Sequence, residues 1–194
     1  VDYVFHLAAQ SRIQPSIINP SYTIRANCHG TENILHAAKE NSVKKMIFSS
    51  SSSVYGIKNQ LPHKEDMPRD CLNPYAISKV GTDLIGRFHA EAYGQKVLVT
   101  RMFTHTGPRR GDVFVESTFA KQIAMIEAKQ IAPVVKVGNL ESIRTFADVR
   151  DAVCAYHMLL TVNPIPGEIY NIGGNFTCKV GEMLDHLLSL LIHL

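Results

Sequence analysis

The sequence lacks the features that mark membrane, disulfide-bonded or nucleic-acid-binding proteins. No apolar run approaches the roughly 18 residues that a membrane-spanning helix needs. The four cysteines are dispersed without a C-x-x-C pair, which predicts reduced thiols in a cytoplasmic protein and argues against a disulfide framework or a zinc site. A net charge of +3, scattered along the chain, is too small to favour nucleic acid.

Metal ligands and a targeting segment are also missing. The nine histidines form neither H-E-x-x-H nor H-x-x-E-H, so no metal site is predicted. No signal peptide is expected before the first predicted strand. What is present is a chain of 194 residues, 45% hydrophobic and 19% charged, which is enough for a soluble globular protein with a substantial core.

Strand-like and helix-like segments alternate along the chain. This alternation predicts an α/β fold with a parallel sheet and helices on its faces. Strands are expected at 1–9, 45–50, 97–103, 134–138 and 168–172. Helices are expected at 20–40, 75–93, 116–129, 149–161 and, as an amphipathic tail, from Val180 onward.

The most informative stretch is a serine run after an apolar strand, followed by a helix that begins N-P-Y-A-I-S-K. Tyr75 and Lys79 lie four residues apart, on one face of that helix. A lysine ammonium beside a phenol should lower the tyrosine pKa and make Tyr75 an acid or base near neutral pH. The alternative is a solvated surface pair, which is the common outcome for this spacing.

The order of strand, serine cluster, V-Y-G, linker and N-P-Y-x-x-S-K resembles the extended short-chain dehydrogenase/reductase family of nucleotide-sugar epimerases, dehydratases and reductases. The resemblance implies that Ser51 is the catalytic hydroxyl, Tyr75 the acid/base and Lys79 its partner. It implies further cofactor contacts with Leu7, Ala8, Ala9, Ser49 and Ser50, besides Tyr75 and Lys79. Read alone, the small residues after the first strand fit simple helix packing about as well.

Two arginine-containing segments follow. The loop T-H-T-G-P-R-R-G, from Thr104 to Gly111, suits phosphate binding, although a solvated basic turn is the common alternative. It resembles the GDP-mannose 4,6-dehydratase and GDP-4-keto-6-deoxymannose reductase branch, with threonine replacing asparagine at 104. That likeness implies cofactor contacts for Phe103, His105 and Arg110. The second segment, from Ile143 to Asp151, resembles the family's R-x-F-x-x-V-x-D, which implies that Arg144 meets the nucleotide diphosphate of the substrate. The resemblance also implies substrate contacts for Ser51, Ser52 and Thr104. Arg144 has the alternative of a salt bridge with Asp148 or Asp151.

The resemblance implies the second half of a Rossmann-like, doubly wound sheet together with part of a small substrate domain. The expected division is 1–105 for the cofactor and catalytic region and 106–194 for a mostly substrate-binding region, intertwined with the first. The family's glycine motif, G-x-x-G-x-x-G, is not present in the sequence, so we expect an interior piece of a longer enzyme. The implied cofactor is NADP(H) or NAD(H).

The implied activity is oxidoreduction at C4 of a nucleotide-linked hexose, with GDP-4-keto-6-deoxy-D-mannose as the expected substrate of a reductase. A 4-epimerase, a 4,6-dehydratase and an inactive cofactor-binding scaffold are the alternatives. Dehydratase relatives place a carboxylate after the catalytic hydroxyl, where this chain has Ser52 and Ser53. A homodimer through the helices 20–40 and 75–93 is also expected.

Overall fold

Two units make up the part of the chain that the computed structural model describes, residues 1–190. The first unit contains residues 1–103 and 153–172. The second contains residues 104–152 and the residues from Gly173 onward. The chain therefore leaves the first unit near the boundary predicted at residue 105 and returns to it after residue 152.

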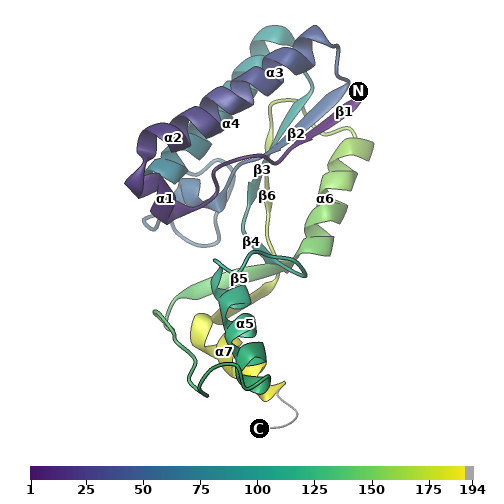
Figure 1. Cartoon of the computed structure of the whole chain (residues 1–194). Coiled ribbons are helices and arrows are strands. Elements are labelled where there is room, and N and C mark those ends of the chain that lie inside the picture. Colours follow the sequence, from purple (N-terminus) through teal and green to yellow (C-terminus); the bar gives the residue numbers. More distant parts are fainter. Residues whose placement is uncertain (191–194) are drawn as a thin grey trace. The chain divides into compact units, whose positions relative to one another are not determined.

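The first unit is built on one parallel sheet (Figure 1). Its strands, in the order β1-β2-β3-β6, are Tyr3–His6, Lys45–Ser49, Val97–Met102 and Ile169–Ile172. The register pairs His6 with Phe48 and Ser49 with Thr100, so neighbouring strands end at one edge. This sheet, with helices on both faces, confirms the predicted α/β, Rossmann-like class.

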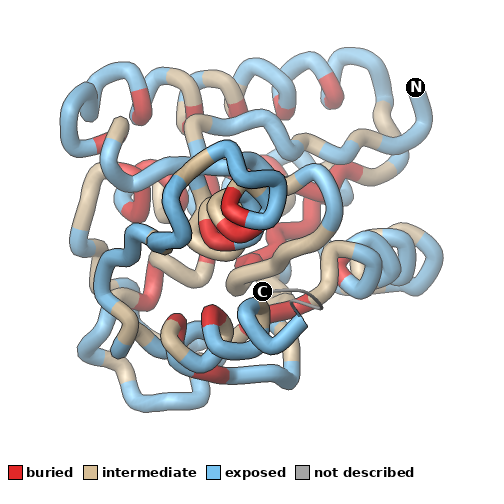
Figure 2. The backbone as a smooth tube through the Cα atoms, turned by 60° about the horizontal axis from the view of Figure 1, so that its bottom comes forward, coloured by how far each residue is buried: buried red, intermediate tan, exposed pale blue. Residues whose placement is uncertain are grey.

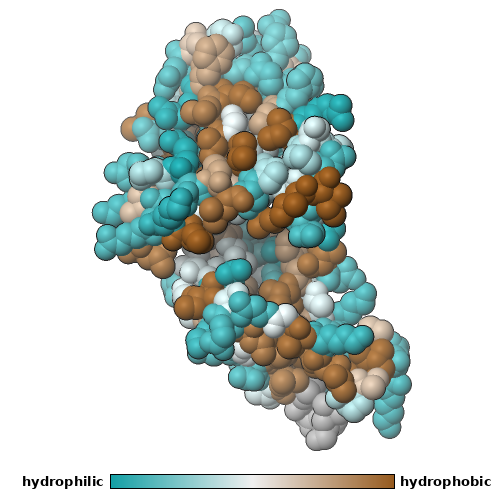
Figure 3. Space-filling view, turned by 90° about the vertical axis from the view of Figure 1, so that its left-hand side faces the viewer, coloured by the Kyte–Doolittle hydropathy of each residue, from teal (hydrophilic) through white to brown (hydrophobic). Residues whose placement is uncertain are grey.

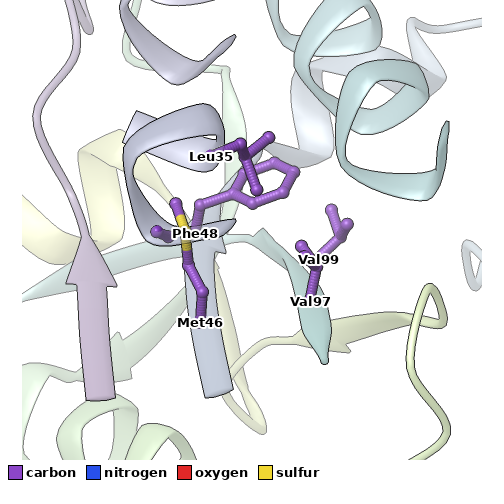
Figure 4. Close-up of a cluster of buried hydrophobic side chains, with 6 residues drawn as sticks. Leu35, Met46, Phe48, Val97 and Val99 are labelled. Carbon is purple, nitrogen blue, oxygen red and sulfur yellow. The ribbon is translucent and has the colours of Figure 1, made fainter. Parts of the chain in front are cut away.

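Alternate residues of the central strands face opposite sides of the sheet. Met46 and Phe48 of β2 pack with Leu35 and with Val97 and Val99 of β3, on the side of helices α3 and α4 (Figure 4). The residue between them, Ile47, instead packs with Leu98 and Leu159 on the side of α6. Both faces are thus buried, which explains the almost continuous apolar runs of β2 and β3.

The helix predicted at 20–40 is one rod with a widened turn in its middle. It comprises α2 (Pro20–Ile24), a π-helical turn (Arg25–His29) and α3 (Gly30–Glu40). A shorter helix that was not predicted, α1 (Ile13–Ile18), precedes it. Asn27 in the π turn is buried, and such turns are frequent at functional sites.

Helix α4, Pro74–Tyr93, follows the predicted signals closely. The Asn73 side chain accepts a hydrogen bond from the Ala76 amide, and Pro74 occupies the first turn. Gly94 ends the helix with φ of 65°, the left-handed cap that glycine adopts without strain. The apolar side chains of α4 are only partly buried, because Leu84 and Phe88 are more than half exposed. Figure 2 shows that buried and exposed positions alternate along the helices of the chain.

The second unit has a three-stranded sheet of its own. Its strands, in the order β4-β5-β7, are Thr104–Thr106, Ile143–Asp148 and Phe176–Lys179. Its helices are α5 (Val115–Glu127) and α7 (Val180–Ser189), which share a core of Phe119, Ile123, Val180 and Leu184. Helix α6, Val149–Thr161, begins in this unit and continues into the first.

Two sequence predictions are wrong in this unit. Residues 134–138 form no strand, and the Gln122 side chain bonds both the amide and the carbonyl of Lys136, the groups that a neighbouring strand would otherwise bond. The segment from Thr104 was predicted as a loop but begins as β4, paired with β5.

Residues 191–194 of the predicted tail lie outside the described residues. No helix within residues 1–190 is long and apolar enough to cross a membrane.

Candidate active site

The carboxyl edge of the parallel sheet gathers most of the predicted site residues of the first unit. Leu7–Ala9 follow β1, Ser49–Ser51 end β2, and Phe103 follows β3. Because the strands are parallel and in register, these residues lie at one edge, where α/β sheets bind ligands. Leu7, Ala8 and Ala9 are exposed there.

Ser51 and Tyr75 meet at this edge. Ser51 caps the 3-10 turn Ser52–Tyr55 by accepting a hydrogen bond from the Ser53 amide at 3.2 Å. The Tyr75 phenol, which is buried at the start of α4, lies near the Ser51 hydroxyl. Burial raises the pKa of the Tyr75 phenol above its ordinary value, and the nearby Ser51 hydroxyl opposes that rise.

The expected lowering of the Tyr75 pKa by Lys79 is therefore wrong for this structure. The Lys79 ammonium lies 5.9 Å from the centre of the Tyr75 ring and donates instead to the Ser49 carbonyl oxygen at 2.6 Å. Desolvation of the phenolate outweighs any attraction by the ammonium. A phenol with a raised pKa stays protonated at neutral pH, so Tyr75 is suited to donate a proton.

Lys79 is the buried cation of the site, and the solvated surface pair is excluded because only 5% of the residue is exposed. Burial lowers the pKa of Lys79 to about 8, whereas the neighbouring Asp83 and Cys28 favour the charged form. An ammonium has three N–H donors, and among residues 1–190 the Ser49 carbonyl is its one hydrogen-bond acceptor.

The start of α4 is held by polar contacts from Ser16 and Asn27. The Tyr75 amide donates to the Ser16 hydroxyl at 3.2 Å, which anchors the helix to α1. Asn27 of the π turn donates to the Ser78 hydroxyl at 2.8 Å and exchanges two hydrogen bonds with the Gln10 backbone. The mid-helix asparagine was a signal for Asn27, but nothing near Ser16 pointed to it.

A fully buried ion pair lies one helical turn beyond Lys79. The Arg101 guanidinium contacts Asp83 Oδ2 at 2.9 and 3.0 Å, and neither side chain is exposed. Arg101 also donates to the Tyr55 hydroxyl at 2.7 Å and to the Glu65 carbonyl at 3.0 Å. The available sequence signals were a carboxylate inside an apolar helix and an arginine inside the apolar strand β3.

In the second unit, Thr104, His105 and Arg144 lie on adjacent strands. Thr104 and His105 belong to β4, opposite Phe146 and Ala147 of β5, and Arg144 precedes Phe146 by two residues on that strand. The salt bridge considered for Arg144 does not form, since its guanidinium donates only to its neighbour's carbonyl, that of Ile143, at 2.8 Å. Asp148 pairs with Arg150 instead.

Arg110 is partly enclosed within the second unit. Its guanidinium forms an ion pair with Glu116 and lies 3.9 Å from the centre of the Phe114 ring. The side chain is thereby held in one place, and a phosphate at this position would share the guanidinium with Glu116. Across residues 1–190, no three histidine, cysteine, aspartate or glutamate residues lie together as metal ligands would.

The family model for GDP-mannose 4,6-dehydratase matches residues 1–191. The chain belongs to this family. GDP-6-deoxy-D-mannose reductase of Pseudomonas aeruginosa is 33% identical over 192 residues, which cover 97% of this chain and 63% of the relative. The dTDP-glucose 4,6-dehydratase of Streptomyces griseus is 32% identical over 188 residues, 97% of this chain and 56% of the relative.

Solved structures place the chain in the same family. The structure of RMD from Pseudomonas aeruginosa complexed with NADPH superposes with a TM-score of 0.90 at 32% identity. The match covers 97% of this chain and 64% of that one, so the chain spans under two thirds of these relatives. The two relatives named above are a nucleotide-sugar reductase and a nucleotide-sugar dehydratase.

Proposed function

We propose that this chain carries the catalytic residues of an NAD(P)H-dependent reductase that converts the C4 ketone of GDP-4-keto-6-deoxy-D-mannose to an alcohol. The observation that carries the proposal is that the Ser51 hydroxyl lies near the buried Tyr75 phenol at the sheet edge, where burial raises the pKa of that phenol. Reduction of a ketone needs a proton donor at the carbonyl oxygen, and a buried neutral phenol supplies one. The 33% identity to a GDP-6-deoxy-D-mannose reductase supports the substrate class.

The chain's own residues have separate roles in this proposal. When substrate is bound, the Ser51 hydroxyl turns its proton from Ser53 to the ketone oxygen, which holds the substrate beside Tyr75 and stabilises the developing negative charge. Tyr75 gives its proton to that oxygen. Lys79 stays beneath the Tyr75 ring as a buried cation, whose positive charge eases the passage of the phenol through the phenolate form.

The first unit fits a nicotinamide dinucleotide. The exposed Leu7, Ala8 and Ala9 allow close approach of a ligand to the backbone, and Lys79 has N–H donors left for ribose hydroxyls. When bound, the reduced nicotinamide supplies the hydride for C4. Phe103, His105 and Arg110 are proposed as further cofactor contacts, and Ser49 and Ser50 complete the set at the end of β2.

A reductase is favoured over a dehydratase by the chemistry next to Ser51. Elimination of water across C5 and C6 needs a carboxylate near the sugar, and serine has no acid/base capacity near pH 7. Ser53 instead accepts a hydrogen bond from the Ser51 hydroxyl at 3.1 Å. Glu65, the other candidate acid, is engaged elsewhere, because its carboxylate accepts from the Asn171 amide at 2.8 Å.

We therefore expect the natural protein to oxidise NADPH or NADH when given GDP-4-keto-6-deoxy-D-mannose and to leave GDP-mannose unchanged. The measurement combines the reduced-nicotinamide absorbance with chromatography of the sugar nucleotide. Formation of the 4-keto-6-deoxy sugar from GDP-mannose would identify a dehydratase and contradict the proposal. Interconversion of C4 epimers without net cofactor oxidation would identify an epimerase.

Arg144 is proposed to bind the diphosphate of the sugar nucleotide, with Thr104 and Ser52 as further substrate contacts. Its exposed guanidinium has no carboxylate partner among the described residues. Charge-assisted hydrogen bonds are worth about 1.5–3 kcal/mol, so Arg144→Ala should raise the KM for sugar nucleotide by roughly tenfold or more and leave the cofactor Kd unchanged. Arg150→Ala is the matched control, because Asp148 already holds Arg150. A lower Tm with an unchanged KM would make Arg144 a structural residue.

We also propose a homodimer through α2, α3 and α4. Their outer surface carries exposed apolar side chains that include Tyr22, Ile34, Leu84 and Phe88, and hydrophobic residues gather on this side of the molecule (Figure 3). A groove of about 730 Å³ runs between the π turn and Ile85 of α4. Contiguous apolar surface of this kind marks an interaction site.

The dimer proposal predicts that Leu84→Glu halves the mass of the protein in sedimentation experiments, because it places a charge in the buried interface. Met158→Glu is the control, since Met158 is equally exposed but lies on α6. A wild-type protein that sediments as a monomer would contradict the dimer.

A further inference from the structure

The three proposed catalytic residues, Ser51, Tyr75 and Lys79, lie on two segments. The distance between these segments must stay constant for the three side chains to act together. Ser51 begins the 3-10 turn that ends at Tyr55, whereas Tyr75 and Lys79 lie on the first two turns of α4. The backbone between Gly56 and Asn73 contains no helix or strand that would hold the two segments together. Two bonds join α4 to the residues just before Ser51, from the Lys79 ammonium to the Ser49 carbonyl at 2.6 Å and from the Ser50 hydroxyl to the Lys79 carbonyl at 3.5 Å. The turn that follows Ser51 needs a further contact to hold it against the helix.

Arg101 on β3 makes contact with both segments. Its guanidinium binds Asp83 of α4 at 2.9 Å and donates to the Tyr55 hydroxyl of the serine turn at 2.7 Å. The ring of Tyr55 also lies beneath the guanidinium, 4.9 Å from centre to Cζ. The planar guanidinium presents its donors in a rigid fork, so these bonds fix direction as well as distance.

Asp83 also places a negative charge near Lys79. It follows Lys79 by four residues, so the two side chains lie on the same face of α4. Asp83 is fully buried, and burial raises the pKa of its carboxyl, while the nearby Ser50 hydroxyl and the Arg101 guanidinium oppose that rise and favour the carboxylate. Three buried charged side chains therefore follow one another: the Arg101 cation, the Asp83 anion and the Lys79 cation.

We propose that Arg101 and Asp83 are positioning residues of the active site: Arg101 ties the turn bearing Ser51 to helix α4, and Asp83 keeps Lys79 charged. The proposal rests on the proposed function for its effect on turnover. The charge of Lys79, however, is measurable without substrate or cofactor. The other titratable groups that act on or respond to Lys79 are Tyr75 on α4, Cys28 on the π turn and His6 on β1.

The test is Asp83→Asn, followed by NMR titration of lysine labelled with ¹³C at Cε. In the wild type, Lys79 should titrate near its pKa of about 8. Loss of the nearby carboxylate should lower that pKa by about one unit. The alkaline fall in kcat should move with it, so that kcat at pH 8 drops about fivefold as the protonated fraction declines. Glu91→Gln is the matched control, an exposed carboxylate on the same helix.

The second variant, Asp83→Leu with Arg101→Met, removes both buried charges, because the single variant leaves Arg101 unpaired. It should fold, show the same lowered Lys79 pKa, and lose more kcat than Asp83→Asn, since Tyr55 then loses its tie to α4. An unchanged Lys79 pKa in either folded variant overturns the proposal, as does failure of both to fold. A lowered Lys79 pKa with unchanged kcat would support the effect on charge while contradicting the proposed function.

Discussion

Replacing Tyr75 with phenylalanine is expected to lower kcat about a hundredfold or more while cofactor affinity stays close to that of the wild type. The substitution removes one hydroxyl, which is the proposed proton donor, and general acid catalysis commonly contributes about 10²–10⁴ in rate. The ring stays in its buried place at the start of α4, so the packing around Ser16 should persist. Steady-state kinetics with the keto sugar nucleotide, together with cofactor titration, would measure both quantities.

Tyr93→Phe is the matched control for this prediction. Tyr93 lies on the same helix but is about half exposed, with the Lys39 ammonium 4.0 Å from its ring centre. Removing that hydroxyl should leave kcat unchanged. Turnover near the wild-type value in Tyr75→Phe would instead assign the proton transfer to another group.

The largest effect on stability is expected from Arg101→Met. It leaves the Asp83 carboxylate buried without its counter-ion, and breaking a buried ion pair in this way costs about 3–5 kcal/mol. Arg101 also loses its bonds to Tyr55 and to the Glu65 carbonyl. Chemical denaturation, with a linear extrapolation of the unfolding free energy, would measure the loss.

Arg87→Met provides the contrast on the same helix. Arg87 and Glu91 form an exposed pair at 3.3 Å, and exposed i,i+4 pairs contribute about 0.3–0.5 kcal/mol. The Asp83→Leu, Arg101→Met double variant should recover much of the lost stability, because apolar side chains can replace a buried pair without leaving a charge. A double variant no more stable than Arg101→Met alone would show that the hydrogen bonds of Arg101, rather than its charge, carry the effect.

The sequence by itself determined the alternation of strands and helices and the places of Ser51, Tyr75 and Lys79. These features follow from local rules: apolar runs form buried strands, Asn73 and Pro74 begin a helix, and Gly94 ends it. The order of the parallel strands then places the end of β2 beside the start of α4. The family also follows from the sequence, since its motifs are short and nearly contiguous.

The tertiary structure decided the protonation of the site residues and the contacts that position them. The direction of the Tyr75 pKa shift depends on how much of the phenol is desolvated, which the spacing of Tyr75 and Lys79 does not reveal. The segment 134–138, predicted as a strand, forms none, and the backbone of Lys136 is bonded instead by the side chain of Gln122, 14 positions earlier in the chain. Likewise, Arg101 and Asp83 are 18 positions apart, and only the packing of β3 against α4 brings them together in a space closed to water. Local propensities cannot predict such contacts, because their free energy depends on burial that exists only in the folded chain.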